Sequence, residues 1–138
     1  MGVAVLSKDR MPIASEDDIV LVRRRARSLA QEHGFDAFAI AAISTAASEL
    51  ARNTWTHGGG GHATVEVLLD GGRAGLRMCF EDRGPGIVQL DRALAGGYST
   101  AKSLGLGLSG SRRLVDEFAI ETDAARGTTV TVTKWARF

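Results

Sequence analysis

The 138-residue chain lacks the features of a disulfide-bonded, membrane-bound or strongly charged protein. Its single cysteine, Cys79, excludes an internal disulfide and a zinc site built on cysteines. The N-terminus has no long apolar run, so we expect no signal peptide and a cytoplasmic protein. Neither charge dominates, because 17 basic residues against 16 acidic ones leave a net charge of +1. We therefore expect neither nucleic acid nor a membrane as partner.

Prolines are also scarce, with only 2 in the chain, whereas the 17 glycines gather in clusters. Clustered glycines usually mark backbone that turns sharply or approaches a ligand closely. The length fits one domain, residues 1–138, and a composition of 44% hydrophobic and 24% charged residues fits a globular core. The glycine clusters are therefore the main indication of a functional site.

Apolar spacing predicts two amphipathic helices in the first half of the chain, after a short strand or loose arm. One helix is expected from the Ser15 N-cap to about His33, before Gly34. The second should run from Asp36 to the glycine run 58–61. The residues predicted to form the buried face of the first helix are Ile19, Val22, Ala26, Leu29 and Ala30.

In the second half, a period of two predicts strands at 64–69 and 76–80, joined by an Asp-Gly-Gly turn. A third helix is expected to open at Gly105 and to run through Phe118. Two more strands are predicted at 119–122 and 128–135. This order predicts an α/β fold of the α+β kind, with a mostly antiparallel sheet and helices on one face.

Two polar residues, Glu49 and Asn53, lie one turn apart on the second predicted helix and therefore share one side of it. The glutamate could accept a proton from a nucleophile, and the amide oxygen of Asn53 could coordinate a hard cation such as Mg²⁺. Such pairs are also common on solvated helix surfaces, so the pair alone leaves both interpretations open.

Two glycine motifs follow. Asp82-x-Gly84-x-Gly86 stands at a predicted strand end, where it would form either a plain turn or a contact with a base amine. Gly105-x-Gly107-x-x-Gly110 would offer backbone N–H groups to phosphates at a helix start. A Rossmann unit is excluded because no strand directly precedes these glycines, and a P-loop because its Gly-x-x-x-x-Gly-Lys-Ser/Thr pattern is absent.

Together, these motifs resemble the three sequence boxes of the GHKL ATPases, the superfamily of gyrases, chaperones and histidine kinases. Residues 49–53 (Glu-Leu-Ala-Arg-Asn) resemble the N box. Asp82 to Ile87 resemble the first glycine box, and Gly105-Leu106-Gly107-Leu108 the second. Within the superfamily, the chain from about Pro12 to Trp135 is similar to the RsbT-type switch serine/threonine protein kinases of bacterial stress signalling.

The resemblance implies a two-layer sandwich of the Bergerat type that binds ATP and Mg²⁺. By this resemblance Asn53 would ligate Mg²⁺, and Glu49 would act as the base on the incoming hydroxyl. The ATP lid would span about 88–104. The residues implied to bind the nucleotide are Asp82, Gly84, Gly86, Ile87, Lys102, Gly105, Leu106, Gly107, Leu108 and Thr128.

The implied function is phosphorylation of a STAS-domain antagonist protein in a partner-switching stress pathway, with a phosphatase or another regulator as a possible later partner. Two alternatives stay open. One is an anti-sigma factor kinase, of the RsbW and SpoIIAB kind, that sequesters a sigma factor. The other is an adaptor that binds nucleotide without transferring phosphate.

Two further clusters receive no catalytic role. His57 and His62 flank the glycine run, and because no further cysteine or histidine lies nearby in the sequence, we predict bystanders in a flexible loop. Arg23, Arg24, Arg25 and Arg27 spread around the first helix, where a solvated face is expected. If that arginine cluster has a role, docking of an acidic protein surface is favoured.

Overall fold

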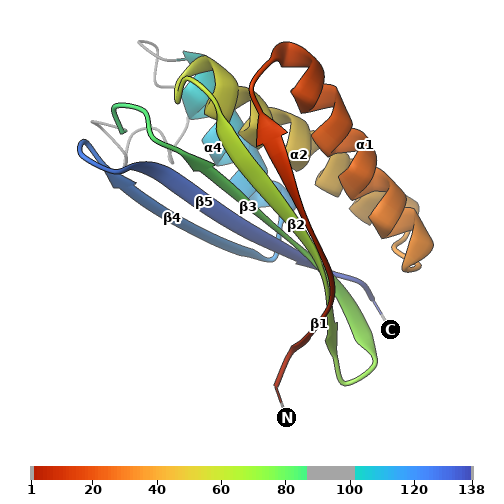
Figure 1. Ribbon diagram of the computed structural model, residues 1–138. Helices are drawn as coiled ribbons and strands as arrows, with labels where there is room; N and C mark the ends of the chain where they lie inside the picture. Colours follow the sequence, from red (N-terminus) through yellow and green to blue (C-terminus); the bar gives the residue numbers. More distant parts are fainter. Residues whose placement is uncertain (1, 87–101, 138) are drawn as a thin grey trace.

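The computed structural model describes residues 2–86 and 102–137, and for residues 102–107 it describes the backbone alone. Figure 1 shows two layers, a sheet with helices packed against one of its faces. The sheet is antiparallel and five-stranded, in the order β1-β2-β3-β5-β4. The elements are β1 (Ala4–Ile13), α1 (Glu16–Glu32), α2 (Ala37–Thr56), β2 (Gly61–Asp70), β3 (Arg73–Asp82), α4 (Lys102–Leu114), β4 (Glu117–Asp123) and β5 (Gly127–Trp135). This architecture confirms the predicted fold class.

The two N-terminal helices follow from local signals in the sequence. Helix α1 ends before Gly34, whose φ of +77° is a conformation that glycine adopts without strain. Helix α2 begins after Asp36, whose carboxylate accepts a hydrogen bond from the backbone N–H of Ala39 at 2.8 Å. The residues that α1 buries are the five predicted ones, Ile19, Val22, Ala26, Leu29 and Ala30.

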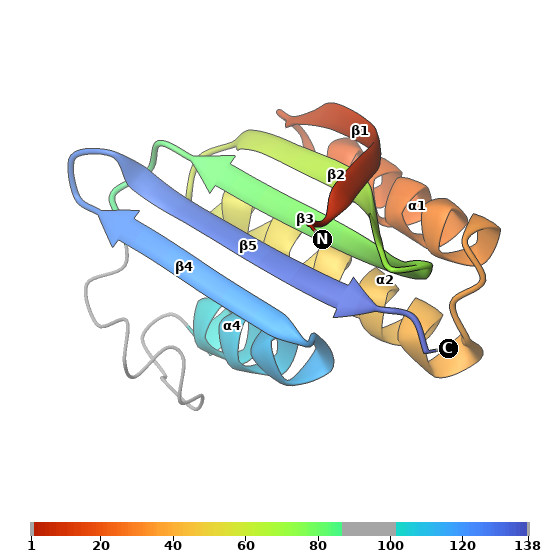
Figure 2. The ribbon, with the colours of Figure 1, turned by 90° about the horizontal axis from the view of Figure 1, so that it is seen from below.

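The core lies between the helices and the inner face of the sheet. Alternate residues of the β2–β3 hairpin face the helices, and Ala63 pairs with Phe80 and Val65 with Met78. These four side chains are at most 2% exposed and belong to one core cluster with residues of α1 and α2. No helix of the described ranges covers the opposite face of the sheet, as Figure 2 shows. Sequence periodicity predicted this arrangement because one face of each strand is apolar.

The strands extend beyond their predicted bounds, and larger differences concern the N-terminal arm and helix α4. The N-terminal arm is a ten-residue edge strand, β1, paired with β2. Helix α4 begins at Lys102, three residues before the expected opening at Gly105. The predicted extension of this helix through Phe118 is wrong, because Phe118 lies in β4 opposite Val132. The backbone N–H of Asp116 donates to the Thr133 carbonyl at 2.9 Å, so the chain enters the sheet immediately after the helix.

One end of the sheet gathers the segments that matter below. Strand β3 ends there at Asp82, β5 begins there at Gly127, and the two strands pair through Glu81 and Thr129. The loop after α2 leads into β2 at the same end, and α4 packs beside α2. None of the helices in the described ranges is long and apolar enough to cross a membrane.

Candidate functional site

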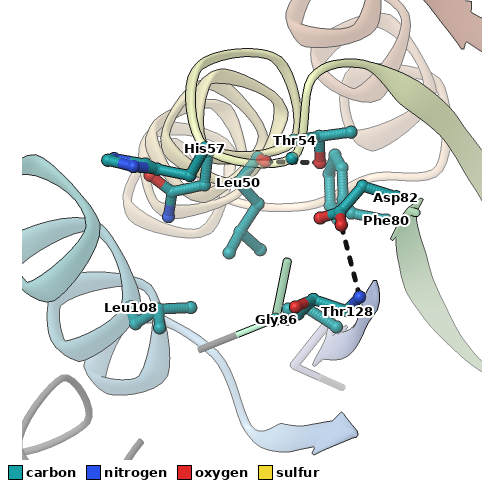
Figure 3. A pocket seen from close by; sticks show the side chains of 11 residues that line it. Leu50, Thr54, His57, Phe80, Asp82, Gly86, Leu108 and Thr128 are labelled. Atoms are coloured by element: carbon teal, nitrogen blue, oxygen red, sulfur yellow. Dashed lines mark hydrogen bonds between the residues drawn. The ribbon is translucent and has the colours of Figure 1, made fainter. Parts of the chain in front are cut away.

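A cavity lies between α2, α4 and the inner face of the sheet, at the end where β3 finishes (Figure 3). Leu50 of α2 and Leu108 of α4 point into it, and Asp82 and Thr128 border it from the sheet side. Its volume of about 30 Å³ is room for one or two water molecules. A larger ligand would therefore require its walls to move. The residues that line the cavity are Leu50, Asn53, Thr54, His57, Gly58, Phe80, Asp82, Gly86, Leu108, Thr128 and Val130.

Helix α2 places its polar residues in the cavity through its 3.6-residue period. Leu50, Asn53 and Thr54 recur at three- and four-residue intervals, so they share one face of the helix. The Thr54 hydroxyl donates a hydrogen bond to the Leu50 carbonyl at 2.9 Å, so this buried hydroxyl has its partner within the helix. The backbone carbonyl of Asn53 accepts from the N–H groups of His57 and Gly58 at 3.0 and 3.1 Å. The end of the helix is thereby closed directly beside the cavity.

Two polar atoms in this wall have no hydrogen-bond partner within the part of the chain that the structure describes. They are Nδ2 of Asn53 and Nε2 of His57, and both are buried. Asn53 as a whole is 8% exposed. A buried polar atom without a partner costs about 1–3 kcal/mol, so such atoms usually have a ligand or water as their partner. Because the oxygen and nitrogen of an asparagine amide can exchange places by rotation, Asn53 could present either a donor or an acceptor there.

Asp82 is held by backbone groups on both sides. Its Oδ1 accepts from the N–H of Gly84 at 2.9 Å and from the N–H of Thr128 at 3.3 Å. The Thr128 hydroxyl in turn lies 2.9 Å from the Thr122 hydroxyl of β4. Oδ2 has no hydrogen bond to any described residue, and it lies beside Gly58, another residue that lines the cavity. One carboxylate oxygen therefore fixes the orientation of the group, and the other is available to a donor from a ligand.

Two glycines allow the chain to approach Asp82 this closely. A Cβ on Gly58 would overlap the Asp82 carboxylate, and a Cβ on Gly127 would overlap the Asp82 carbonyl. Gly127 also has a φ of +91°, which disfavours any other residue. The glycine run 58–61, to which the sequence analysis gave no chemical role, therefore begins with a packing contact to the candidate site.

The structure brings together some of the predicted site residues and not others. Asn53, Asp82, Gly86, Leu108 and Thr128 line one cavity, although they come from distant segments of the chain. Glu49 lies one turn before Asn53, is half-buried, and is not among the lining residues.

The remaining predicted residues are placed only in part. Gly84 packs beside the cavity, and a Cβ there would lie 2.7 Å from the Cα of Gly58. Ile87 and the predicted lid up to residue 101 lie outside the described residues. The backbone of α4 includes Lys102, Gly105, Leu106 and Gly107, so the second glycine box lies within the first turns of this helix.

His57 is the residue that the sequence analysis placed wrongly. It was expected to be a bystander in a flexible loop, but it caps the end of α2 and lines the cavity. Figure 3 shows its ring directed toward the α4 side. Its spacing of three from Thr54 and four from Asn53 continues the face of α2 that already carried the site, and that signal could have identified it.

Comparisons with known proteins identify the family to which this fold belongs. Residues 13–134 match the family model described as "Histidine kinase-like ATPase domain". The chain is 42% identical over 125 residues to the "Serine/threonine-protein kinase RsbT" of Bacillus subtilis (strain 168), which covers 91% of this chain and 94% of the relative.

A solved structure, "Mycobacterial sensor histidine kinase MprB", aligns with 95% of this chain and 99% of its own at 19% identity, with a TM-score of 0.49. The family model covers nearly the whole described core and includes all three sequence boxes. The chain therefore belongs to the family of histidine kinase-like ATPase domains.

Proposed function

We propose that the protein is an ATP-dependent serine/threonine protein kinase. The observation that carries this proposal is the arrangement of Asp82 and Asn53 on opposite walls of one cavity, each with a polar atom free for a ligand. The 42% identity to a protein named as a serine/threonine kinase supports the reaction class. The proposed place of action is the cytoplasm, where this chain would phosphorylate other proteins.

Asp82 is the proposed contact for the adenine. Oδ1 is already occupied by two backbone N–H groups, so Oδ2 would accept the hydrogen bond from the exocyclic amine of the base. The Thr128 backbone holds this carboxylate in place from β5, and its hydroxyl would support the base from the same side. After the cavity walls have moved apart to admit the base, Leu50 and Leu108 would lie against the faces of the ring, as apolar side chains do in most ligand pockets.

Asn53 is the proposed Mg²⁺ ligand. Its buried amide has an unpartnered end, which fits the oxygen ligand that Mg²⁺ prefers once the amide presents its oxygen. Mg-ATP, when bound, supplies the transferable phosphoryl group together with a cation that neutralises phosphate charge. His57 lies beside Asn53 with a buried ring nitrogen, so we add it to the residues that would contact the nucleotide.

Glu49 is the proposed base. It lies one turn from Asn53 but outside the cavity, so we place it beside the outer end of the nucleotide, where the hydroxyl of a protein substrate would arrive. It would accept the proton of that hydroxyl as the phosphoryl group is transferred. The start of α4, with Lys102 and Gly105 in its first turn and Gly107 in the next, would supply a positive helix end and, from the lysine, a charge for the phosphates.

A STAS-domain antagonist in a partner-switching stress pathway is the proposed substrate. The test is incubation of the purified chain with Mg²⁺, labelled ATP and candidate STAS proteins. We expect label on a serine or threonine of one of them. Binding of nucleotide without transfer to any candidate would instead support the adaptor function, and stable capture of a sigma factor would support the anti-sigma function.

Two variants separate binding from transfer. Asp82→Asn should weaken nucleotide binding by about 1.5–3 kcal/mol, which is roughly tenfold to a hundredfold in Kd, because the charged acceptor is lost. Glu49→Ala should bind nucleotide normally by calorimetry but lose roughly 10²–10⁴-fold in transfer rate. Full transfer by Glu49→Ala would remove Glu49 from the mechanism, and unchanged affinity in Asp82→Asn would remove Asp82 from the adenine contact.

A further inference from the structure

A second hollow, of about 310 Å³, lies on the opposite side of the strand that carries Asp82. Register places it on the face without helices: Phe80 and Ala63 point to the core, so Glu81 and His62 point the other way. Arg10 of β1 pairs with Thr64, two residues from His62, and therefore shares this outer face. Figure 2 views the sheet from this side, with the end of β3 and the β4–β5 turn at the same end.

Three arginines converge on the hollow from separate parts of the chain. Arg10 comes from β1, Arg83 directly follows β3, and Arg126 directly precedes β5. All three are exposed, and among the residues that the structure describes none of them forms an ion pair. Two arginines elsewhere are paired: Arg25 of the α1 arginine cluster bonds Asp9 at 2.7 Å, and Arg77 bonds Glu66 at 2.9 Å. The hollow is therefore a place where unpaired guanidinium groups collect.

Two glycines contribute to the lining of the hollow. Gly60 and Gly61 form part of it, and a Cβ on Gly61 would overlap the Glu81 carbonyl. A Cβ on Gly60 would lie 2.9 Å from the Ile13 carbonyl. These two glycines therefore let neighbouring strands and loops pack closely beside the hollow that the three arginines line.

We infer that this hollow docks an acidic segment of a protein partner. Each guanidinium can bind a carboxylate through two parallel N–H donors, which suits glutamate and aspartate side chains. The Glu81 carboxylate lines the same hollow, and the chain as a whole has a net charge of only +1. Both features oppose a dense polyanion such as nucleic acid, whereas spaced carboxylates can avoid Glu81.

The site does not depend on the nucleotide proposal, although the two share a wall. Arg83 follows Asp82 directly, and Arg126 precedes Gly127, which packs on the Asp82 carbonyl. A partner held by these arginines would lie against the loops that orient Asp82, without entering the nucleotide cavity. Docking can therefore be measured in the absence of nucleotide, and its failure would leave the proposed kinase activity untouched.

The test measures binding of a fluorescent oligoglutamate peptide to the full chain by anisotropy at low ionic strength. The double charge reversal Arg10→Glu with Arg126→Glu should weaken binding about tenfold or more, whereas the double lysine variant at the same positions should retain most of it. The matched control is Arg24→Glu with Arg27→Glu, which makes the same charge change on α1. Circular dichroism verifies that each variant is folded, and glutamine replaces glutamate at both positions if the reversal variant is not.

Three outcomes would overturn the proposal. The first is unchanged peptide binding by folded variants with both arginines replaced. The second is an equal loss in the α1 control, because binding would then follow net charge rather than the hollow. The third is tighter binding of a single-stranded oligonucleotide of matched charge than of the peptide, which would assign the hollow to a nucleic acid instead of an acidic protein.

Discussion

Among single residues, Gly58 restricts the candidate site most directly, because a side chain there would occupy the space of the Asp82 carboxylate. We expect Gly58→Ala to destabilise the protein by about 1–3 kcal/mol, the usual cost of overpacking, and to weaken nucleotide binding through displacement of Asp82. Urea unfolding monitored by circular dichroism measures the first effect, and calorimetry the second.

Gly110 supplies the matched control for this substitution. It lies in α4, and a Cβ there would meet no atom of the described residues within 4 Å outside its own helix turn. Gly110→Ala should therefore stabilise the protein by about 0.5–1 kcal/mol, because alanine loses less backbone freedom in a helix. If both alanine variants proved equally stable, the argument from close packing at Gly58 would be wrong.

Cys79 gives a prediction about pH at the same scale. Burial raises the pKa of its thiol above the ordinary value, and the nearby Glu81 and Glu66 carboxylates act in the same direction, against a hydrogen bond from Thr131. The folded protein therefore holds the thiol proton more tightly than the unfolded chain does. The stability that the protonated thiol contributes to the folded protein is fully present below the ordinary thiol pKa. It is lost as the pH rises through the raised pKa of the folded state.

The measurable consequence for Cys79 is slow alkylation. At neutral pH the thiolate fraction should be smaller than in an unfolded peptide, so iodoacetamide should react more slowly with the folded chain. Adding urea should restore the rate of a free thiol. A folded-state rate equal to that of the unfolded chain would contradict the raised pKa.

At the scale of elements, helices and strands were predicted most accurately where one hydrophobic period persists over a long segment. In α1 the apolar residues recur at helical spacing between Ser15 and Gly34, and the structure buries the predicted five. The β2–β3 hairpin followed equally well from its alternation and its glycine turn. Both cases combine a clear period with a clear stop signal.

The α4–β4 junction shows where that reasoning fails. Val115 and Phe118 fit a helical spacing as well as the start of a strand, because a short apolar run does not distinguish the two periods. Pairing with β5 selects the strand over the helix, since Phe118 lies opposite Val132 and Asp116 bonds to β5 through its backbone and its side chain. Such pairing cannot be inferred from residues 115–118 alone.

Leu108 tests how α4 is held against α2. It is 1% exposed and borders the cavity, so Leu108→Ala should cost about 2–5 kcal/mol through lost burial and the space left behind. The control is Leu21→Ala on α1, where the side chain is 50% exposed and the cost should stay within about 0.5 kcal/mol. Urea denaturation of both variants measures the difference, and equal costs would mean that α4 is not anchored through Leu108.

For the whole molecule, the candidate site exists only when distant segments meet. The sequence boxes predicted Asn53 and Asp82 as site residues, and the wider family resemblance added Thr128. The position of His57 in the cavity wall and the packing of Gly58 against Asp82 were not predicted. Their importance depends on what the end of β3 places opposite them, which is a property of the fold rather than of the local sequence.

Ligand binding should therefore stabilise the molecule as a unit. Nucleotide at about a hundred times its Kd adds roughly 2.7 kcal/mol to the free energy of unfolding, which should raise Tm by several degrees. Differential scanning fluorimetry with Mg-ATP should show this rise, a smaller one after chelation of the metal, and little in Asp82→Asn. An equal rise in Asp82→Asn would place the nucleotide elsewhere.

The turn between β2 and β3 is a suitable site for an insertion. Gly71 and Gly72 are exposed, have positive φ, and a Cβ at either would meet nothing within 4 Å. In Figure 1 this turn lies at the opposite end of the sheet from the finish of β3. A fluorophore or an affinity tag spliced in there would report on the protein in living cells while leaving both hollows clear.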